Sequence, residues 1–327
     1  MKNVVIYTHS GDQPVWEPVA AALHTRGAQP WILSTDRFPI DFGLVWSGPG
    51  EGYLDLGAAG RLSLSAIDAV WFRRDAVGRG LPASLPEDVR RASATESRGV
   101  LRAALLDTPA FLLDPPALYA RARNKALQMV VAREAGVRIP QTIETNDPEE
   151  ARDFIAGVGG AVIAKMHADV RLQGGTVYTN VLGPGDVEAL DELAGCPMIL
   201  QEAIPKAREL RVVCAGRRLF AVSLENTELE GAARDDWRRA GLQTLNRWRP
   251  YTLPASVHDA LQRFYDQLGM NYSSADLIVT PDGEHVLLES NGVGESFWLY
   301  DHHPLADSLA EVLLGTVPRR PVPPELR

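Results

Sequence analysis

Apolar and polar positions alternate along the first hundred residues in a strand–helix–strand order. Short apolar runs predict strands at residues 4–7, 30–33 and 69–72. Helical spacing predicts two helices, at residues 14–24 and 93–106. Strands that alternate with helices are typical of a parallel sheet covered by helices. We therefore expect an α/β unit over residues 1–112.

The rest of the chain predicts an α+β arrangement. Asp114, followed by two prolines, is expected to cap a helix whose pattern reaches Ala135, and Asn124 can restart it so that Lys125 lies at a helix N-terminus. Further strands are expected at residues 161–165, 177–179, 198–202, 210–215, 219–224, 276–280 and 286–290. Further helices are expected at residues 147–156, 186–193, 255–268 and 305–314. We place a central subdomain, a C-terminal subdomain and an extended, loosely held proline-rich tail at residues 113–199, 200–316 and 317–327.

Composition and charge exclude several classes of protein. With 45% hydrophobic and 23% charged residues, the chain is not largely disordered. No apolar run reaches the roughly 18 residues of a membrane span, and the N-terminus turns polar too early for a secretory signal. Two cysteines, Cys196 and Cys214, cannot build a disulfide framework, so we expect a cytoplasmic protein without a membrane partner. The net charge of −9 argues against nucleic-acid binding, and an acidic ligand needs a local basic patch.

A late hairpin carries the most informative polar residues. Pro-Asp-Gly at 281–283 separates two apolar runs, which is a hairpin signal. A turn centred on the Asp-Gly pair places Asp276 opposite Glu289, and Asn291 shares their face. Two carboxylates and an amide oxygen are hard ligands suited to Mg²⁺ that also holds phosphate oxygens. A solvated hairpin face, or a register slip of one residue, is the alternative.

The scarce lysines and one glycine loop indicate phosphate binding. Lys125 lies at a possible helix start and Lys165 ends a strand, and a compact ammonium suits phosphate oxygens. A single lysine is more often a surface residue. Gly174 and Gly175 belong to a loop whose amides could cover phosphates. The chain has neither the Walker pattern nor G-x-G-x-x-G after its first strand, which disfavours a dinucleotide dehydrogenase.

The segment from Gln201 to Arg211 joins two predicted strands and is rich in charge. Its carboxylates could accept hydrogen bonds from ribose hydroxyls, and its backbone could contact an adenine edge. Arg211 is placed to clamp a phosphate with two hydrogen bonds. A charged linker with nothing bound is the alternative.

With these elements in order, the chain resembles the ATP-grasp superfamily and, more narrowly, the peptide-macrocyclising ligases that mature microviridins and related graspetides. The motifs that carry the resemblance lie at residues 8–12, 36–39, 70–74, 124–125, 139–142, 145–149, 164–166, 201–211, 276 and 289–291. The resemblance implies an α/β N-terminal domain followed by an ATP-grasp fold, in which two α+β subdomains clasp ATP.

The resemblance also implies a cofactor role for each matching position, with ATP and Mg²⁺ as the cofactors. The nucleotide would be held by Lys125, Lys165, Gly174, Gly175, Gln201, Glu202, Ala203, Ile204 and Glu209. The metal would be held by Asp276, Glu289 and Asn291.

The same resemblance assigns catalytic and substrate roles. Arg211 would face the γ-phosphate and an acyl phosphate, and Arg238 would orient the substrate carboxylate. The substrate side would further include Arg73, Arg74, Asp236 and Trp237.

The implied reaction is carboxylate activation on a ribosomal precursor peptide with a leader and an acidic core. The γ-phosphoryl group passes to a side-chain carboxylate, and a hydroxyl or amine then attacks to form an ester or amide. Arginines crowd residues 208–249, where they would attract an acidic peptide despite the negative net charge. A homodimer is the family expectation. Two alternatives stay open: a ligase that joins a free amino acid or amine to a peptide or small acid, and a non-catalytic peptide- or nucleotide-binding protein.

Overall fold

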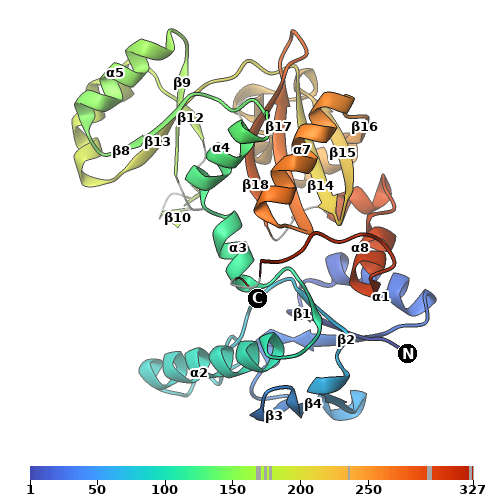
Figure 1. Cartoon of the computed structure of the whole chain (residues 1–327). Helices are drawn as coiled ribbons and strands as arrows, with labels where there is room; N and C mark the ends of the chain where they lie inside the picture. Colours follow the sequence, from blue (N-terminus) through green and yellow to red (C-terminus); the bar gives the residue numbers. More distant parts are fainter. Residues whose placement is uncertain are drawn as a thin grey trace.

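The first part of the chain is a parallel sheet with helices packed against it (Figure 1). The computed structural model describes residues 1–166, 171–172, 175–176, 179–234, 236–292, 297–323 and 326. The sheet has the order β2-β1-β6-β7, with β1 (Asn3–Thr8), β2 (Gln29–Ser34), β6 (Ala69–Phe72) and β7 (Phe111–Leu113) all parallel. Two long helices, α1 (Gln13–Thr25) and α2 (Glu87–Leu106), accompany it. The predicted α/β unit is confirmed, although α2 begins six residues before the predicted helix start at 93.

In the first unit, the sequence pattern did not predict four short strands. They are the edge strand β7 and a three-stranded antiparallel sheet of β3 (Gly43–Gly48), β4 (Glu51–Asp55) and β5 (Arg61–Ser63). Strand β3 is mostly exposed, so it lacks the alternation of buried and exposed positions that marks a half-buried strand.

The central subdomain has a second sheet, with order β12-β9-β13-β8, and its own small hydrophobic core. Its strands are β8 (Thr142–Thr145), β9 (Val162–Lys165), β12 (Asn180–Val181) and β13 (Met198–Glu202). A two-stranded hairpin adds β10 (Arg171–Leu172) and β11 (Gly175–Thr176). The helices are α3 (Pro116–Ala122), α4 (Lys125–Glu134), α5 (Pro148–Val158), α6 (Pro184–Glu188) and the 3₁₀ segment η4 (Ala189–Gly195). Of the strand predicted at 177–179, residues 177 and 178 lie outside the described residues.

The helical pattern after residue 114 is two helices rather than one. The Asn124 side chain accepts a hydrogen bond of 3.0 Å from the Leu127 amide, so Asn124 caps α4 and Lys125 is its first residue. The expected cap at Asp114 is wrong. Its buried carboxylate instead accepts the backbone N–H groups of Asn271 and Tyr272, each at 2.9 Å, and so ties the start of α3 to a distant strand.

The C-terminal subdomain is a five-stranded antiparallel sheet with the order β16-β15-β14-β17-β18. Its strands are β14 (Arg208–Ala215), β15 (Arg218–Glu225), β16 (Arg249–Tyr251), β17 (Tyr272–Val279) and β18 (His285–Asn291). It also contains α7 (Ala255–Leu268), α8 (Leu305–Leu314) and the 3₁₀ segments η5 (Asn226–Glu228), η6 (Gly231–Arg234), η7 (Trp237–Arg247) and η8 (Phe297–Asp301). Helix α8 packs on α1, and one hydrophobic core includes residues of both, so the chain returns to its first unit at the end.

The tail is anchored, contrary to the sequence expectation of a loosely held segment. Arg320 is buried, and its guanidinium forms an ion pair of 2.7 Å with Asp266. The Arg319 guanidinium lies 3.6 Å from the ring centroid of Phe111. Buried polar contacts of this kind require matched partners, which the apolar and polar pattern of a proline-rich tail does not reveal.

No helix in the described part of the chain is both long enough and apolar enough to cross a bilayer.

Candidate active site between the two subdomains

The late hairpin brings Asp276 and Glu289 opposite each other, as predicted. The loop and strand register that produce this pairing differ from the prediction. Thr280 and Glu284 close a three-residue loop, because the Thr280 amide donates to the Glu284 carbonyl at 2.9 Å. A bulge then inserts Leu288, because Leu277 pairs with Leu287 while Asp276 pairs with Glu289. The bulge restores the pairing that the loop alone would shift by one residue.

The three expected oxygen-bearing side chains converge. The Asn291 amide nitrogen lies 3.3 Å from Asp276 Oδ2 and 3.4 Å from Glu289 Oε1. Lys125 Nζ lies 3.2 Å from Glu289 Oε2. Burial raises the pKa of the Glu289 carboxyl, but the charges of Lys125 and Lys165, with hydrogen bonds from Lys125 and Asn291, outweigh it and lower the pKa to about 2. Glu289 is therefore ionised at neutral pH.

Gln128 fixes Lys125 against this hairpin. It lies one turn after Lys125 on α4, and its side chain donates to the Ser290 carbonyl at 2.8 Å and accepts from the Ser290 amide at 2.8 Å. Because both bonds are buried, they fix the position of α4 relative to β18. The ammonium of Lys125 is thereby placed beside the carboxylate of Glu289.

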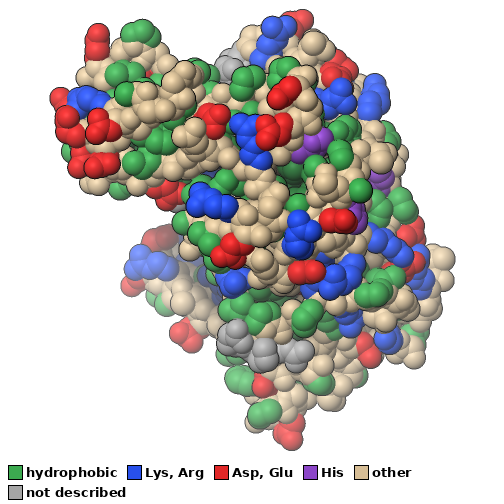
Figure 2. Space-filling model, turned by 45° about the horizontal axis from the view of Figure 1, so that its top comes forward, with side chains coloured by type: hydrophobic (Ala, Val, Ile, Leu, Met, Phe, Trp, Pro, Cys, Tyr) green, Lys and Arg blue, Asp and Glu red, His purple; other side chains and the backbone are tan. Residues whose placement is uncertain are grey.

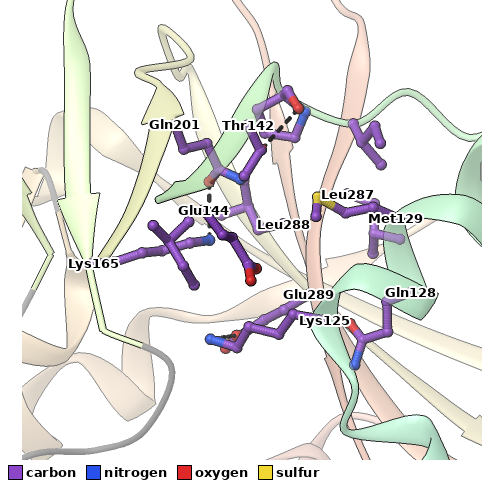
Figure 3. A pocket seen from close by; sticks show the side chains of 13 residues that line it. Lys125, Gln128, Met129, Thr142, Glu144, Lys165, Gln201, Leu287, Leu288 and Glu289 are labelled. Carbon is purple, nitrogen blue, oxygen red and sulfur yellow. Dashed lines mark hydrogen bonds and ion pairs between the residues drawn. The ribbon is translucent and has the colours of Figure 1, made fainter. Parts of the chain in front are cut away.

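A cavity that is partly open to solvent lies beside this cluster, between the central and C-terminal subdomains (Figure 3). It is lined by Lys125, Gln128, Met129, Ile139, Pro140, Thr142, Glu144, Lys165, Ile199, Gln201, Leu287, Leu288 and Glu289. Lys165 Nζ donates to Gln201 Oε1 at 3.0 Å, and Gln201 Nε2 donates to Thr142 Oγ1 at 2.8 Å. The cavity thus combines apolar walls with two ammonium groups, a lining that suits a flat apolar ring carrying an anionic chain.

The segment after β13 surrounds one side of this region. The Glu202 carboxylate accepts the Gln141 amide at 3.2 Å, and the Ala203 amide donates to the Ala161 carbonyl at 2.9 Å. Ile204 is buried in a small apolar cluster with residues of β17 and β18. The buried carboxylate of Glu209 pairs with Lys206 at 2.6 Å.

Arg211 lies on β14, directly opposite Asp276 on β17. Its Nη1 is 3.0 Å from Asp276 Oδ1 and 3.2 Å from Ser274 Oγ. Its guanidinium carbon also lies 5.5 Å from the Trp298 ring centroid. Trp298 belongs to a cluster of three tryptophans with Trp237 and Trp248, whose ring centroids are 5.3–6.4 Å apart. The guanidinium is thus held by a carboxylate, a hydroxyl and an aromatic face.

The remaining expected residues are the two glycines and the residues assigned to the substrate. Asp236 is buried, next to Trp237, while the side chain of Arg238 and all of Gly174 lie outside the described residues. Gly175 belongs to β11. Arg73, buried and paired with Asp12 at 3.4 Å, and the half-buried Arg74 follow β6 in the first unit, and neither lines the cavity.

Sequence reasoning missed several residues around the cavity and Arg211. Gln128, Glu144, Ser274 and Trp298 were not singled out as functional. Periodicity offers a signal for two of them, because Ser274 lies two residues before Asp276 on one strand face, and Gln128 lies three residues after Lys125 on one helix face. Trp298 has no such signal, because it reaches Arg211 from a distant segment.

Comparison with known proteins identifies this arrangement. The chain is 31% identical to a RiPP-associated ATP-grasp ligase of Chryseobacterium gregarium, whose structure contains ADP and a leader and core peptide, where RiPP denotes a ribosomally synthesised, modified peptide. That match covers 98% of both chains, with a TM-score of 0.91. The chain belongs to this family of ATP-grasp ligases. It is also 32% identical to the macrocyclase MdnC of Microcystis aeruginosa, bound there to the precursor peptide MdnA, over 96% of this chain and 100% of MdnC, with a TM-score of 0.84.

Two further comparisons agree with membership of the ATP-grasp ligases. A family model described as the MvdD pre-ATP grasp domain matches residues 3–119, which include the parallel sheet. Among curated relatives, a probable alpha-L-glutamate ligase of Saccharophagus degradans is 25% identical over 185 residues. That match covers 55% of this chain and 59% of the relative, so the chain spans little more than half the length of the curated relatives it matches.

Proposed function

We propose that this ATP-grasp ligase closes side-chain rings in a ribosomally made precursor peptide with a leader and an acidic core. The observation that carries the proposal is the 31% identity, over 98% of both chains, to a ligase whose structure holds ADP together with a leader and core peptide. A cavity lined by two ammonium groups and two carboxylates supports the proposal, because ammonium groups suit the phosphates of a nucleotide.

The reaction we propose has two steps. A peptide Asp or Glu carboxylate attacks the γ-phosphorus of ATP, which forms an acyl phosphate and releases ADP. A peptide hydroxyl or amine then attacks the acyl carbon, which forms an ester or amide and releases phosphate, while its proton passes to solvent or phosphate. Neither step needs a nucleophile from the protein, so the chain contributes positioning and positive charge.

The residues around the hairpin fit a magnesium ion. Among the described residues no three His, Cys, Asp or Glu side chains gather as a metal site, so a third protein ligand would be a neutral oxygen. Asn291 meets this need, because a half-turn of its amide presents Oδ1 where the nitrogen now faces both carboxylates. We assign the metal to Asp276, Glu289 and Asn291, and the ion when bound would neutralise phosphate charge. Lys125 and Arg211 already balance the two carboxylates, so the site has little net charge before nucleotide binds.

For the nucleotide, we assign the phosphates to Lys125 and Lys165 and the base to the apolar walls. Gln201 holds the Lys165 ammonium toward the cavity, as Figure 3 shows. The backbone of residues 202–204 would contact the adenine edge, and Glu209 would contact the ribose. Gly174 and Gly175 remain expected phosphate contacts.

For the peptide, we assign Arg211 to the transferred phosphoryl group. Arg238, Asp236 and Trp237 remain expected on the substrate side, as do Arg73 and Arg74. Figure 2 shows Asp and Glu side chains gathered on the outer end of the central subdomain, where α5 lies, and Lys and Arg side chains spread over the middle of that face. An acidic core would avoid the first region and favour the second.

The deciding experiment uses a short acidic peptide encoded beside the gene, incubated with the full chain, ATP and Mg²⁺. We expect mass spectrometry to find the loss of one water per ring, with ADP and phosphate formed in step. Peptide that keeps its mass while it binds would overturn the ligase assignment.

A second candidate function is addition of a free amino acid, favoured by the match to probable alpha-L-glutamate ligases. The same experiment, supplemented with glutamate, separates the two. A gain of one residue mass supports addition, and a loss of water supports ring closure.

We further infer a homodimer. Helix α2 supports it, because residues 87–100 are all exposed or half-buried and include the exposed apolar side chains Val89 and Val100. Light scattering on the purified chain should give twice the monomer mass, and Val100→Glu should lower that value.

A further inference from the structure

Among the arginine contacts that join the central and C-terminal subdomains, two lie at opposite edges of the central sheet. At the β8 edge, Arg138 pairs with Glu284 of the C-terminal hairpin and lies 3.7 Å from Glu202. The chain itself also crosses on this side, since β13 lies next to β8 and continues into β14. The opposite edge is β12, and there Arg239 makes the contact.

Arg239 reaches β12 from η7 of the C-terminal subdomain. Its Nη2 donates to the Thr179 carbonyl and to Asn180 Oδ1, each at 2.8 Å. Its backbone amide donates to the Asp236 carbonyl at 3.0 Å. Charge-assisted bonds of this length are stronger than neutral ones, so Arg239 links the two subdomains at this edge.

Both ends of this contact lie next to residues assigned to the reaction. Asn180 pairs with Ala164, the residue before Lys165. Trp237, two residues before Arg239, stacks edge-on against Trp298 at 5.9 Å, and the Arg211 guanidinium lies over Trp298. Arg239 therefore connects the strand beside a phosphate-binding lysine to the aromatic support of the catalytic arginine.

We propose that Arg239 is a positioning residue that latches the subdomains together over bound nucleotide and aligns Lys165 with Arg211. The chemical part of this inference rests on the proposed function. A closed cleft excludes water, which otherwise attacks the acyl phosphate and returns the carboxylate and free phosphate without a ring. Loss of the latch then raises the ATP consumed per ring formed.

The test compares full-length Arg239→Gln, Asn180→Ala and their double variant with the parent chain. Arg121→Gln is the matched control, because Arg121 also donates to backbone carbonyls of another element, those of Gln267 and Leu268, away from the cleft. Two readouts are needed. The first is compaction on adding Mg²⁺ and a non-hydrolysable ATP analogue, measured by small-angle scattering, which requires no peptide. The second is ATP consumed per water lost from the peptide.

We expect Arg239→Gln to weaken compaction and raise the ATP cost per ring about tenfold, which is the effect of losing one to two charge-assisted bonds. Asn180→Ala should have a smaller effect, because Arg239 keeps its hydrogen bond to the Thr179 carbonyl. In the Arg239→Gln background, Asn180→Ala should cause no further loss of compaction and no further rise in the ATP cost per ring. Arg239→Lys should restore part of the compaction. Unchanged compaction in Arg239→Gln, or an equal loss in Arg121→Gln, would refute the latch. If the parent chain closes without forming rings, the proposed function fails while the compaction readout still tests Arg239.

Discussion

Arg211 and Asp276 face each other across β14 and β17, and their side chains form an ion pair of 3.0 Å. The Arg211 side chain is only 7% exposed, and Ser274 and Trp298 hold it from two other directions. A guanidinium fixed in this way costs little reorganisation when negative charge develops beside it. The pair thus places a rigid cation next to the assigned magnesium ligands.

Arg211→Lys should lower kcat about a hundredfold while the KM for ATP changes little. A lysine keeps the charge but loses the planar fork and the contact with the Trp298 ring, so stabilisation is lost mainly in the transition state. Steady-state ADP release and ring formation measure both constants. Arg208→Lys is the control, because Arg208 points to the other strand face and pairs with Glu225. A hundredfold rise in KM at constant kcat would show that Arg211 only binds nucleotide.

Glu289→Ala should abolish ATP turnover, with a loss of at least about a hundredfold, and leave the fold intact. The change removes one metal ligand and leaves Lys125 without its carboxylate, and metal stabilisation of phosphoryl charge is worth several kcal/mol. ATP turnover at increasing Mg²⁺ measures the loss, and circular dichroism checks the fold. Glu284→Gln, on the same hairpin but outside the cavity lining, should retain most turnover. Full turnover in Glu289→Ala would remove the metal assignment.

Gln201→Leu should raise the KM for ATP about tenfold. The amide holds Lys165 and Thr142 at 3.0 and 2.8 Å, and a leucine leaves both without that partner in a half-buried site. The loss of a hydrogen bond to a charged group costs about 1.5–3 kcal/mol. Thr142→Val should raise the KM for ATP less than Gln201→Leu does. In the Gln201→Leu background, its effect should be smaller than its effect in the parent chain. Additive effects of the two changes would mean that they act separately.

The hairpin with the assigned metal ligands shows which features of the structure can be predicted from the sequence and which cannot. The sequence predicts the pairing of Asp276 with Glu289 from a two-residue turn, but the loop is one residue longer and the Leu288 bulge corrects the shift. The longer loop and the bulge shift the strand register in opposite directions, so their effects cancel. Neither has a reliable sequence signal, because bulges depend on packing. The cap at Asn124 is different, since its hydrogen bond joins residues only three positions apart and the local sequence predicts it.

Long-range polar contacts account for most of what the sequence did not reveal. Asp114 has the pattern of a cap, but its partners, the amides of Asn271 and Tyr272, lie more than a hundred residues away. Arg320 lies in a proline-rich tail and is nonetheless among the largest fully buried side chains. Hydrophobic periodicity places helices and strands, yet it holds no information about which buried polar groups meet.

Asp114 should make stability fall as pH rises toward neutrality. Burial raises the pKa of its carboxyl to about 7 from an ordinary value of 3.8, although hydrogen bonds from the two amides oppose the shift. Between these values the folded protein keeps a proton that the unfolded chain has lost, so the free energy of unfolding decreases with pH. Urea unfolding from about pH 5 to about pH 8 should show the slope, and Asp114→Asn should flatten it. Asp259→Asn, at an exposed site, should leave the slope unchanged.

Arg320→Met should destabilise the protein by about 2–4 kcal/mol, because the methionine removes every hydrogen bond that the fully buried guanidinium makes to its acceptors. These acceptors are Asp266, Gln262, Cys214 and the carbonyls of Gly216 and Met270. Arg217→Met is the matched control, since Arg217 pairs with the same Asp266 at 3.2 Å but is 48% exposed, and an exposed pair is worth at most about 1 kcal/mol. Urea midpoints of the two variants and the parent chain make the comparison. Equal, small losses would mean that the tail contributes little to the fold, whereas a large loss for Arg320 alone would make the tail an integral part of the C-terminal subdomain.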